Sequence, residues 1–178
     1  NAKQYLKYAD ERTQPAIDLA ARIPVEAPKR IVDIGCGPGN STAVLARRFP
    51  DAHILGIDNS PEMIEAARAA HPGLEFAICD AATELETLDS DFDVVFSNAC
   101  IQWVPDHPVL LSHMLALLRP GGALAIQTPH NFDEPIHRII KVVSGDWLSG
   151  DNPRIFHTLT PGEYYDLLVP IASSFCMW

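Results

Sequence analysis

The chain has 178 residues, with 13 Lys plus Arg against 23 Asp plus Glu, so its formal charge is −10. This length suits one domain with a sizeable core, and 47% hydrophobic with 20% charged residues excludes a disordered chain. The acidic excess argues against nucleic acid as a partner and against an anionic membrane surface.

Membrane and metal classes are also disfavoured by the sequence. No apolar run reaches the length of a membrane-spanning helix, and the first residues lack the apolar stretch of a signal peptide. The four cysteines (Cys36, Cys79, Cys100 and Cys176) form no C-x-x-C pair, which argues against a zinc site and a disulfide framework. We therefore expect a cytoplasmic protein with reduced thiols and no metal.

Short apolar runs alternate with helical periods along most of the chain. Strands are predicted over residues 30–35, 53–58, 74–80, 92–97 and 123–128, with helices over residues 41–49, 61–70 and 107–118. The acidic stretch 84–93 is expected to be a solvated loop. Apolar strands alternating with helices predict an α/β fold: a Rossmann-like three-layer sandwich around a mostly parallel sheet.

The pattern loosens after Thr128. One amphipathic helix is predicted over residues 136–143, a loop over 149–158, and a helix capped by Thr160 and Glu163 that runs to Leu168. The last residues, 171–178, are predicted to form a sixth strand.

A glycine-rich turn follows the first predicted strand and opens a helix. Residues 33–41 are DIGCGPGNS, and the glycines (Gly35, Gly37 and Gly39) allow positive φ and close approach of a ligand to the backbone. The dinucleotide pattern G-x-G-x-x-G fails, because position 40 is Asn. Asp33, two residues before the first glycine, suits a ligand that carries an ammonium group. The alternative is a tight strand–helix turn without a ligand.

Polar residues end the next three predicted strands. Asp58 can accept two ribose hydroxyls, Asp80 can accept a hydrogen bond from an adenine amino group, and Asn98 ends the fourth strand. Because the carboxyl ends of parallel strands share one edge, the implied ligand has an amine, a ribose and an adenine, and no pyrophosphate. The alternatives are a helix N-terminal acid for Asp58 and a loop acid for Asp80.

These residues resemble the class I S-adenosylmethionine-dependent methyltransferases over residues 30–128. The motifs are VDIGCGPG (32–39), GIDNSPEM (56–63), CDA (79–81) and LRPGG (118–122). The resemblance implies S-adenosyl-L-methionine as cofactor and S-adenosyl-L-homocysteine as product. It implies that Asp33 and the three glycines line the methionine moiety, that Asp58 holds the ribose, and that Met63 packs on the adenine. It places Asp80 and Ala81 at the adenine edge, and Asn59 and Asn98 complete the expected cofactor-binding set. Met63 also fits a plain core position.

A finer resemblance is to the trans-aconitate methyltransferases. It rests on residues 5–16 (YLKYADERTQPA), 37–42 (GPGNST), 97–107 (SNACIQWVPDH) and 163–168 (EYYDLL). It implies methyl transfer to a carboxylate of a small polycarboxylic acid, giving the monomethyl ester of trans-aconitate. No catalytic residue is certain, and Gln102, Trp103 and Arg12 are the candidates for positioning the acceptor. Gln102 and Trp103 also fit a packed corner.

Other readings of the function stay open at this point. The acceptor is a different small carboxylate or hydroxyl in one of them, and the chain is a cofactor-binding module without turnover in another. We expect one domain over residues 1–178, with an N-terminal lid segment (1–29), a cofactor-binding core (30–128) and an acceptor side (129–178), and we favour a monomer. Because the resemblance implies seven strands, we also expect these residues to be part of a longer chain.

Overall fold

The computed structural model describes residues 9–131, 134–135, 139 and 156–178, and side chains from residue 13 onward. Five strands form one sheet in the order β3-β2-β1-β4-β5, and every pairing is parallel. The strands are β1 (Arg30–Ile34), β2 (His53–Asp58), β3 (Glu75–Ile78), β4 (Phe92–Asn98) and β5 (Leu118–Gln127). The predicted α/β fold and its five strands are confirmed.

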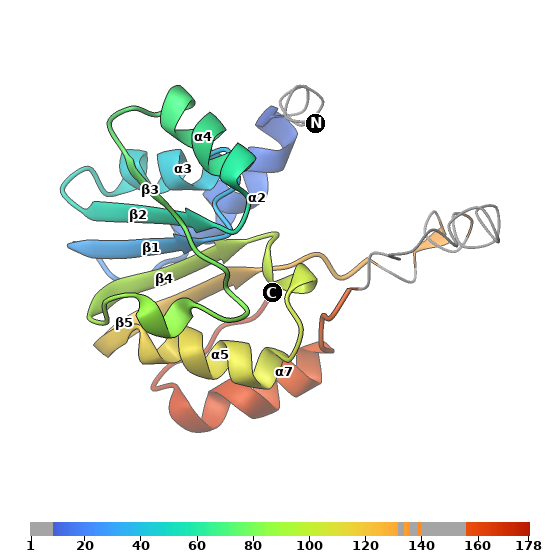
Figure 1. Ribbon diagram of the computed structural model, residues 1–178. Helices are drawn as coiled ribbons and strands as arrows, with labels where there is room; N and C mark the ends of the chain where they lie inside the picture. The colour runs from blue at the N-terminus through green and yellow to red at the C-terminus, as the bar shows by residue number, and fades with distance from the viewer. Residues whose placement is uncertain (1–8, 132–133, 136–138, 140–155) are drawn as a thin grey trace.

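Helices cover both faces of the sheet (Figure 1). One face carries α2 (Ala9–Ala21), α3 (Asn40–Arg48) and α4 (Pro61–Ala70), and the other carries α5 (His107–Ala116) and α7 (Pro161–Leu168). Each face has its own apolar core: Ile31 and Phe96 pack with α2 and α3, whereas Val32 and Val95 pack with α5. Alternate residues of a buried parallel strand serve the two layers in this way.

Side-chain caps fix the helix starts that the sequence predicts. The Ser60 hydroxyl accepts from the Met63 amide, and the Asp106 carboxylate accepts from the Val109 amide. Thr160 and Glu163 form a complete capping box at α7. Each side chain satisfies amide donors that have no partner inside the helix.

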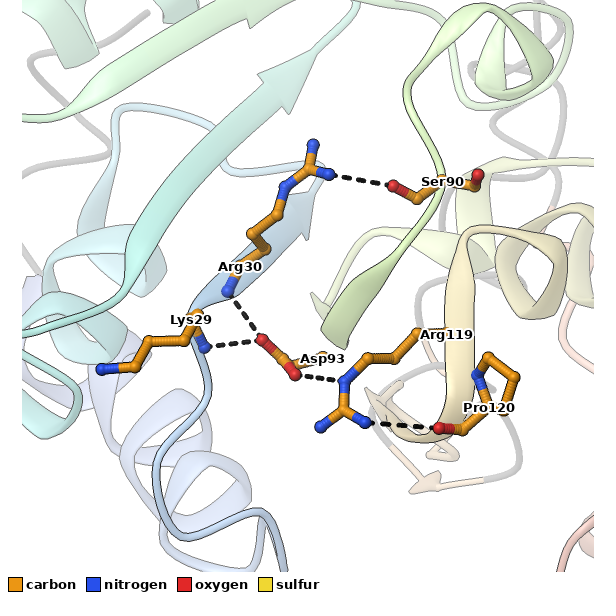
Figure 2. A network of polar contacts seen from close by, with 6 residues as sticks. All are labelled: Lys29, Arg30, Ser90, Asp93, Arg119 and Pro120. Atoms are coloured by element: carbon orange, nitrogen blue, oxygen red, sulfur yellow. Dashed lines mark hydrogen bonds and ion pairs between the residues drawn. The ribbon is translucent and has the colours of Figure 1, made fainter.

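A buried carboxylate, that of Asp93, ties together the amino ends of three strands (Figure 2). Its Oδ2 accepts from the backbone amides of Lys29 and Arg30 at 2.6 and 2.8 Å, and its Oδ1 accepts from Arg119 Nε. Burial alone would raise the pKa of Asp93, but the two amides and Arg119 hold it below its ordinary value. Asp93 is therefore part of the core of β4, and the expectation of a solvated loop is wrong for this residue.

Two expectations about the later part of the chain need correction. β5 begins at Leu118 rather than at residue 123, because a register shift opposite Phe92 and Val94 takes up Gly121, which has φ +80°. The predicted sixth strand is wrong: Val169–Ile171 is a 3-10 helix, and residues 172–178 form no strand. That apolar stretch has no neighbouring strand among the described residues, and a strand needs a hydrogen-bonded neighbour. Most of the predicted 136–143 helix and 149–158 loop lies outside the described residues.

Among the helices that the structure describes, none has both the length and the apolar character needed to cross a membrane.

Candidate functional site

The predicted site residues meet at the carboxyl edge of the sheet. Asp33 lies on β1, Asp58 ends β2, Asp80 follows β3 and Asn98 ends β4. The strand order places them in the sequence Asp80, Asp58, Asp33, Asn98 across the sheet. Parallel strands bring residues that are far apart in the chain to one edge, where α/β folds bind ligands.

The three glycines of the turn after β1 have positive φ, but they serve different purposes. A Cβ on Gly35 would lie 2.1 Å from Cys100 Sγ, and one on Gly39 would lie 2.7 Å from the His71 ring. Both glycines are therefore required by packing. A Cβ on Gly37 would meet nothing within 4 Å, so the open space lies over Gly37.

Asp33 is fully buried and has one oxygen without a partner. Its Oδ2 accepts from the hydroxyls of Ser41 and Thr42, both at 2.6 Å, whereas Oδ1 is buried with no hydrogen bond among the described residues. Burial raises the pKa of Asp33 to about 6, against the lowering effect of the two hydroxyls and with a further rise from the charge of Asp58. A buried carboxylate with a free oxygen fits a cationic ligand.

Asp58 reaches back to the glycine turn. Its Oδ2 accepts from the Gly37 amide at 3.0 Å and its Oδ1 from the Ser60 amide at 2.9 Å. Asn59 is exposed beside it, and Met63 is half-buried in the first turn of α4. The three positions lie at the carboxyl end of β2 and in the start of α4 that follows it.

Asp80 and Ala81 lie in the turn after β3. The Asp80 carboxylate accepts from the Ala82 amide, and the Asp80 amide donates to Glu84. Ala81 packs against the apolar core under α5. This turn places a carboxylate at the far end of the row.

Asn98 borders a small pocket beneath α2. The pocket is lined by Thr13 and Ala16 of α2 and by Gly35, Ser41 and Asn98, among others. The first turns of α2 therefore border the pocket beside the glycine turn. The backbone of Arg12 forms part of α2, next to Thr13, but the side chain of Arg12 lies outside the described part.

Gln102 and Trp103 form a corner at the end of β4, in the 3-10 helix η2 (Ile101–Trp103). Gln102 is buried; its Nε2 donates to the Ala99 carbonyl, and its backbone carbonyl accepts from the His157 amide at 2.9 Å. Trp103 is 43% exposed and packs on Phe156, with ring centroids 4.6 Å apart. Gln102 thus holds the corner, while Trp103 presents an aromatic face.

A buried histidine supports this corner from below. His107 Nε2 lies 2.9 Å from the Ile101 carbonyl and its Nδ1 lies 2.5 Å from the Tyr164 hydroxyl. A carbonyl only accepts, so Nε2 donates, and in the neutral ring Nδ1 accepts from Tyr164. His107 therefore joins η2 to α7, which the sequence did not indicate.

The cysteines at the site are unsuited to nucleophilic chemistry. Cys36 lies within the glycine turn, and Cys100 lies against Gly35. Burial, reinforced by nearby carboxylates, raises the pKa of both thiols, that of Cys100 to about 12. The reactive form of cysteine is the thiolate. Within the described part of the chain, no group of three or more His, Cys, Asp or Glu is placed to hold a metal.

The sequence did not indicate the residues that reach the site from the neighbouring helices. Thr13 reaches the pocket from α2, and Ser41 and Thr42 hold Asp33 from the first turn of α3. The spacing of eight or nine residues from Asp33 across a strand–turn–helix was the available sign.

Positive charge is segregated to the opposite edge of the sheet. Every Lys and Arg with a described side chain lies after a helix, in its last turn, or near the start of a strand. These residues are Arg22, Lys29, Arg30, Arg47, Arg48, Arg68 and Arg119. Helices of this fold end at the amino edge, so the carboxyl edge is acidic throughout the described residues.

Known proteins match both the sequence and the fold. Residues 31–122 match the family described as "Methyltransferase domain". A protein named trans-aconitate 2-methyltransferase from Methylobacterium radiotolerans is 49% identical over 100% of this chain and 70% of its own length. One of the same name from an Azoarcus species is 46% identical over 99% of this chain and 70% of its own length.

A solved S-adenosylmethionine-dependent methyltransferase from Mesorhizobium loti superposes with a TM-score of 0.66 at 26% identity, over 86% of this chain and 77% of that one. The glycine turn, the row of acids and these similarities agree. The chain belongs to the methyltransferase-domain family and, within it, groups with the trans-aconitate 2-methyltransferases.

Proposed function

We propose that this protein transfers a methyl group from S-adenosyl-L-methionine to a carboxylate of trans-aconitate, releasing S-adenosyl-L-homocysteine. The observation that carries the proposal is the row of Asp80, Asp58 and Asp33 at the ends of three adjacent strands. The names of relatives that are 43–50% identical to this chain support the choice of acceptor.

The residues present fit the cofactor. The buried Asp33 Oδ1 and Asn98 Oδ1 have no partners among the described residues, and they suit the ammonium of an amino acid. The open space over Gly37 admits a ligand close to the backbone. Asp58 would accept from the ribose hydroxyls, with Asn59 beside it, while Met63, Asp80 and Ala81 would border the adenine.

The acceptor needs no general base. A carboxylic acid with a pKa of about 4 is ionised at neutral pH and is already a nucleophile. When bound, S-adenosylmethionine supplies a methyl group on a sulfonium, which is an activated leaving group. The protein then contributes mainly orientation, which supplies roughly 7–11 kcal/mol in well-aligned reactions. Gln102 would fix the corner that carries Trp103, and Trp103 would form an apolar wall beside the acceptor.

The remaining proposals concern how the ends of the chain contribute. Thr13 lines the pocket, so the segment around α2 supports a lid over the cofactor-binding core, with Arg12 as a candidate cation. Residues 129–178 would supply the acceptor side. The division into lid, core and acceptor side remains our proposal.

The function is tested by incubating the protein with methyl-labelled S-adenosylmethionine and a panel of small acids: trans-aconitate, cis-aconitate, citrate and isocitrate. We expect a base-labile methyl ester, formed fastest from trans-aconitate. Asp58→Ala should raise the dissociation constant of the cofactor at least tenfold, because two hydrogen bonds to a charged acceptor are lost. Asp89→Ala is the matched control, since Asp89 is an exposed acid on a surface ion pair. Cofactor binding without ester formation from any acid would refute the proposed reaction.

A further inference from the structure

Gln127 is a half-buried residue whose side-chain oxygen is accounted for neither by the fold nor by the cofactor. It is the last residue of β5, and its Oε1 is buried with no hydrogen-bond partner among the described residues. Native proteins leave few buried polar atoms unpaired, because leaving such an atom unpaired costs free energy. A ligand that pairs with this amide removes that cost.

Gln127 stands beside a second amide in the same condition. Its Cα is in register with that of Asn98 on β4, and the Oδ1 of Asn98 is also buried and unpartnered in the described structure. Residues in register on paired strands point to the same face. The two side-chain amides therefore form one adjacent pair at the carboxyl edge.

The pair lies on the α2 face of the sheet. Asp33 is in register with Phe96, and Phe96 packs against residues of α2. Asn98 follows Phe96 by two residues, so it shares this face, and it lines the pocket with Thr13 of α2. The amide pair is thus continuous with the pocket over the glycine turn.

The strand order indicates which reactant the pair meets. Asp80, Asp58 and Asp33 occupy β3, β2 and β1, which orders the proposed adenine, ribose and methionine contacts across the sheet. Asn98 on β4 comes next, and Gln127 on β5 lies beyond it. A ligand that extends from β3 across β2 and β1 reaches its end beside β4. The residue on β5 therefore lies next to the space left for the second reactant.

The charges of this edge favour an uncharged contact. Every described Lys and Arg lies toward the other edge, and Asp33 lies on β1, the strand next to that of Asn98. An amide side chain offers an N–H₂ donor as readily as a carbonyl, because its orientation is chosen by its partners. A carboxylate can therefore be held here by amide donors.

We propose that Gln127, paired with Asn98, binds a carboxylate of the acceptor by donating a hydrogen bond from its side-chain amide. Gln127 is then an acceptor-binding residue, and Asn98 contacts both reactants. This inference rests on the proposed function, since it assumes an acceptor that carries carboxylates.

Gln127→Glu tests the proposal by replacing a donor with a like charge. We expect the KM for trans-aconitate to rise at least tenfold, while the dissociation constant of S-adenosylmethionine, measured by calorimetry, stays within twofold. Gln127→Leu, of similar size and uncharged, should raise the same KM severalfold. Ser112→Glu is the control, because it adds the same charge at an exposed position of α5, on the other face of the sheet, and it should change neither quantity.

The outcomes separate the two proposals. Unchanged KM in Gln127→Glu and Gln127→Leu, with a wild type that methylates trans-aconitate, overturns the role of Gln127 alone. A rise in the cofactor dissociation constant in Gln127→Leu, together with tighter cofactor binding in Gln127→Glu, assigns the amide to the cofactor ammonium and overturns it too. A wild type that binds cofactor but methylates no acid overturns the proposed function, and this inference with it. Retained cofactor binding shows that each variant is folded.

Discussion

Asp33 is expected to lower the free energy of unfolding of the protein as long as no cation is bound beside its carboxylate. Its pKa is raised from 3.8 to about 6 by burial, so the folded state holds the proton more tightly than the unfolded chain. For a carboxyl group shifted in this direction, stability is highest below the unfolded pKa and falls as pH rises through the folded value. Asp33→Asn removes the ionisation and keeps an oxygen to accept from Ser41 and Thr42.

The expected gain follows from the shift. Two pKa units correspond to about 3 kcal/mol at pH 8 and about half of that at pH 5. For a chain of this size, 1 kcal/mol changes Tm by about 2–4 °C, so Asp33→Asn should melt about 6–12 °C higher at pH 8. The same variant should bind S-adenosylmethionine at least tenfold more weakly, because the charge facing the ammonium is gone.

Urea denaturation of wild type and Asp33→Asn, without cofactor at pH 5 and pH 8, measures the effect. The difference between the two proteins cancels the titration of every other group. A variant that is less stable than wild type at pH 8, or a gain of equal size at both pH values, would refute the reasoning.

Three further substitutions test other parts of the structure. Asp93→Asn should lower the free energy of unfolding by about 2–3 kcal/mol at pH 7, since it weakens charge-assisted bonds to two amides and Arg119. Because the pKa of Asp93 is lowered, this loss of stability should shrink as pH falls below about 4. A loss that stays constant with pH would contradict the prediction. Gly37→Ala should cost only about 1–2 kcal/mol of stability, because of its φ of +53°, but should weaken cofactor binding at least tenfold. Gly35→Ala should instead destabilise the fold by clashing with Cys100. Thermal melts measure the stability of the two variants and calorimetry their cofactor binding; normal cofactor binding by Gly37→Ala would count against the space over Gly37 as part of the cofactor site. Tyr164→Phe should cost about 1–3 kcal/mol by leaving the buried His107 Nδ1 without its partner; Tyr165→Phe, at an exposed tyrosine, is the control, and equal melting of the two variants would show that the His107–Tyr164 bond adds nothing.

Local patterns predicted most of the fold because each element has a near-sequence cause. The caps at Ser60 and Thr160 and the apolar strands lie within a few residues of what they control. The β5 boundary and the absent sixth strand could not be predicted in this way, since both depend on strand pairing. Hydrophobic pattern does not state whether a neighbour is present.

The candidate site divides along the same line. The acids at the strand ends follow from parallel topology, so the meeting of Asp33, Asp58 and Asp80 at one edge could be predicted from the sequence. The separate duties of the glycines were not, because they depend on Cys100 and His71, which come from distant segments. The amide of Gln127 gave no sequence sign, since only the register with Asn98 places it at the edge.

The segregation of charge between the two edges of the sheet has a kinetic consequence. A cationic sulfonium is drawn toward the acidic edge, while a polyanionic acid is repelled from it, and both effects are screened by salt. With the charges of the described residues, raising the ionic strength should therefore lower the association rate of the cofactor and raise that of the acceptor. Binding in the order cofactor first is favoured, because the arriving cation lowers the field that the anion must cross.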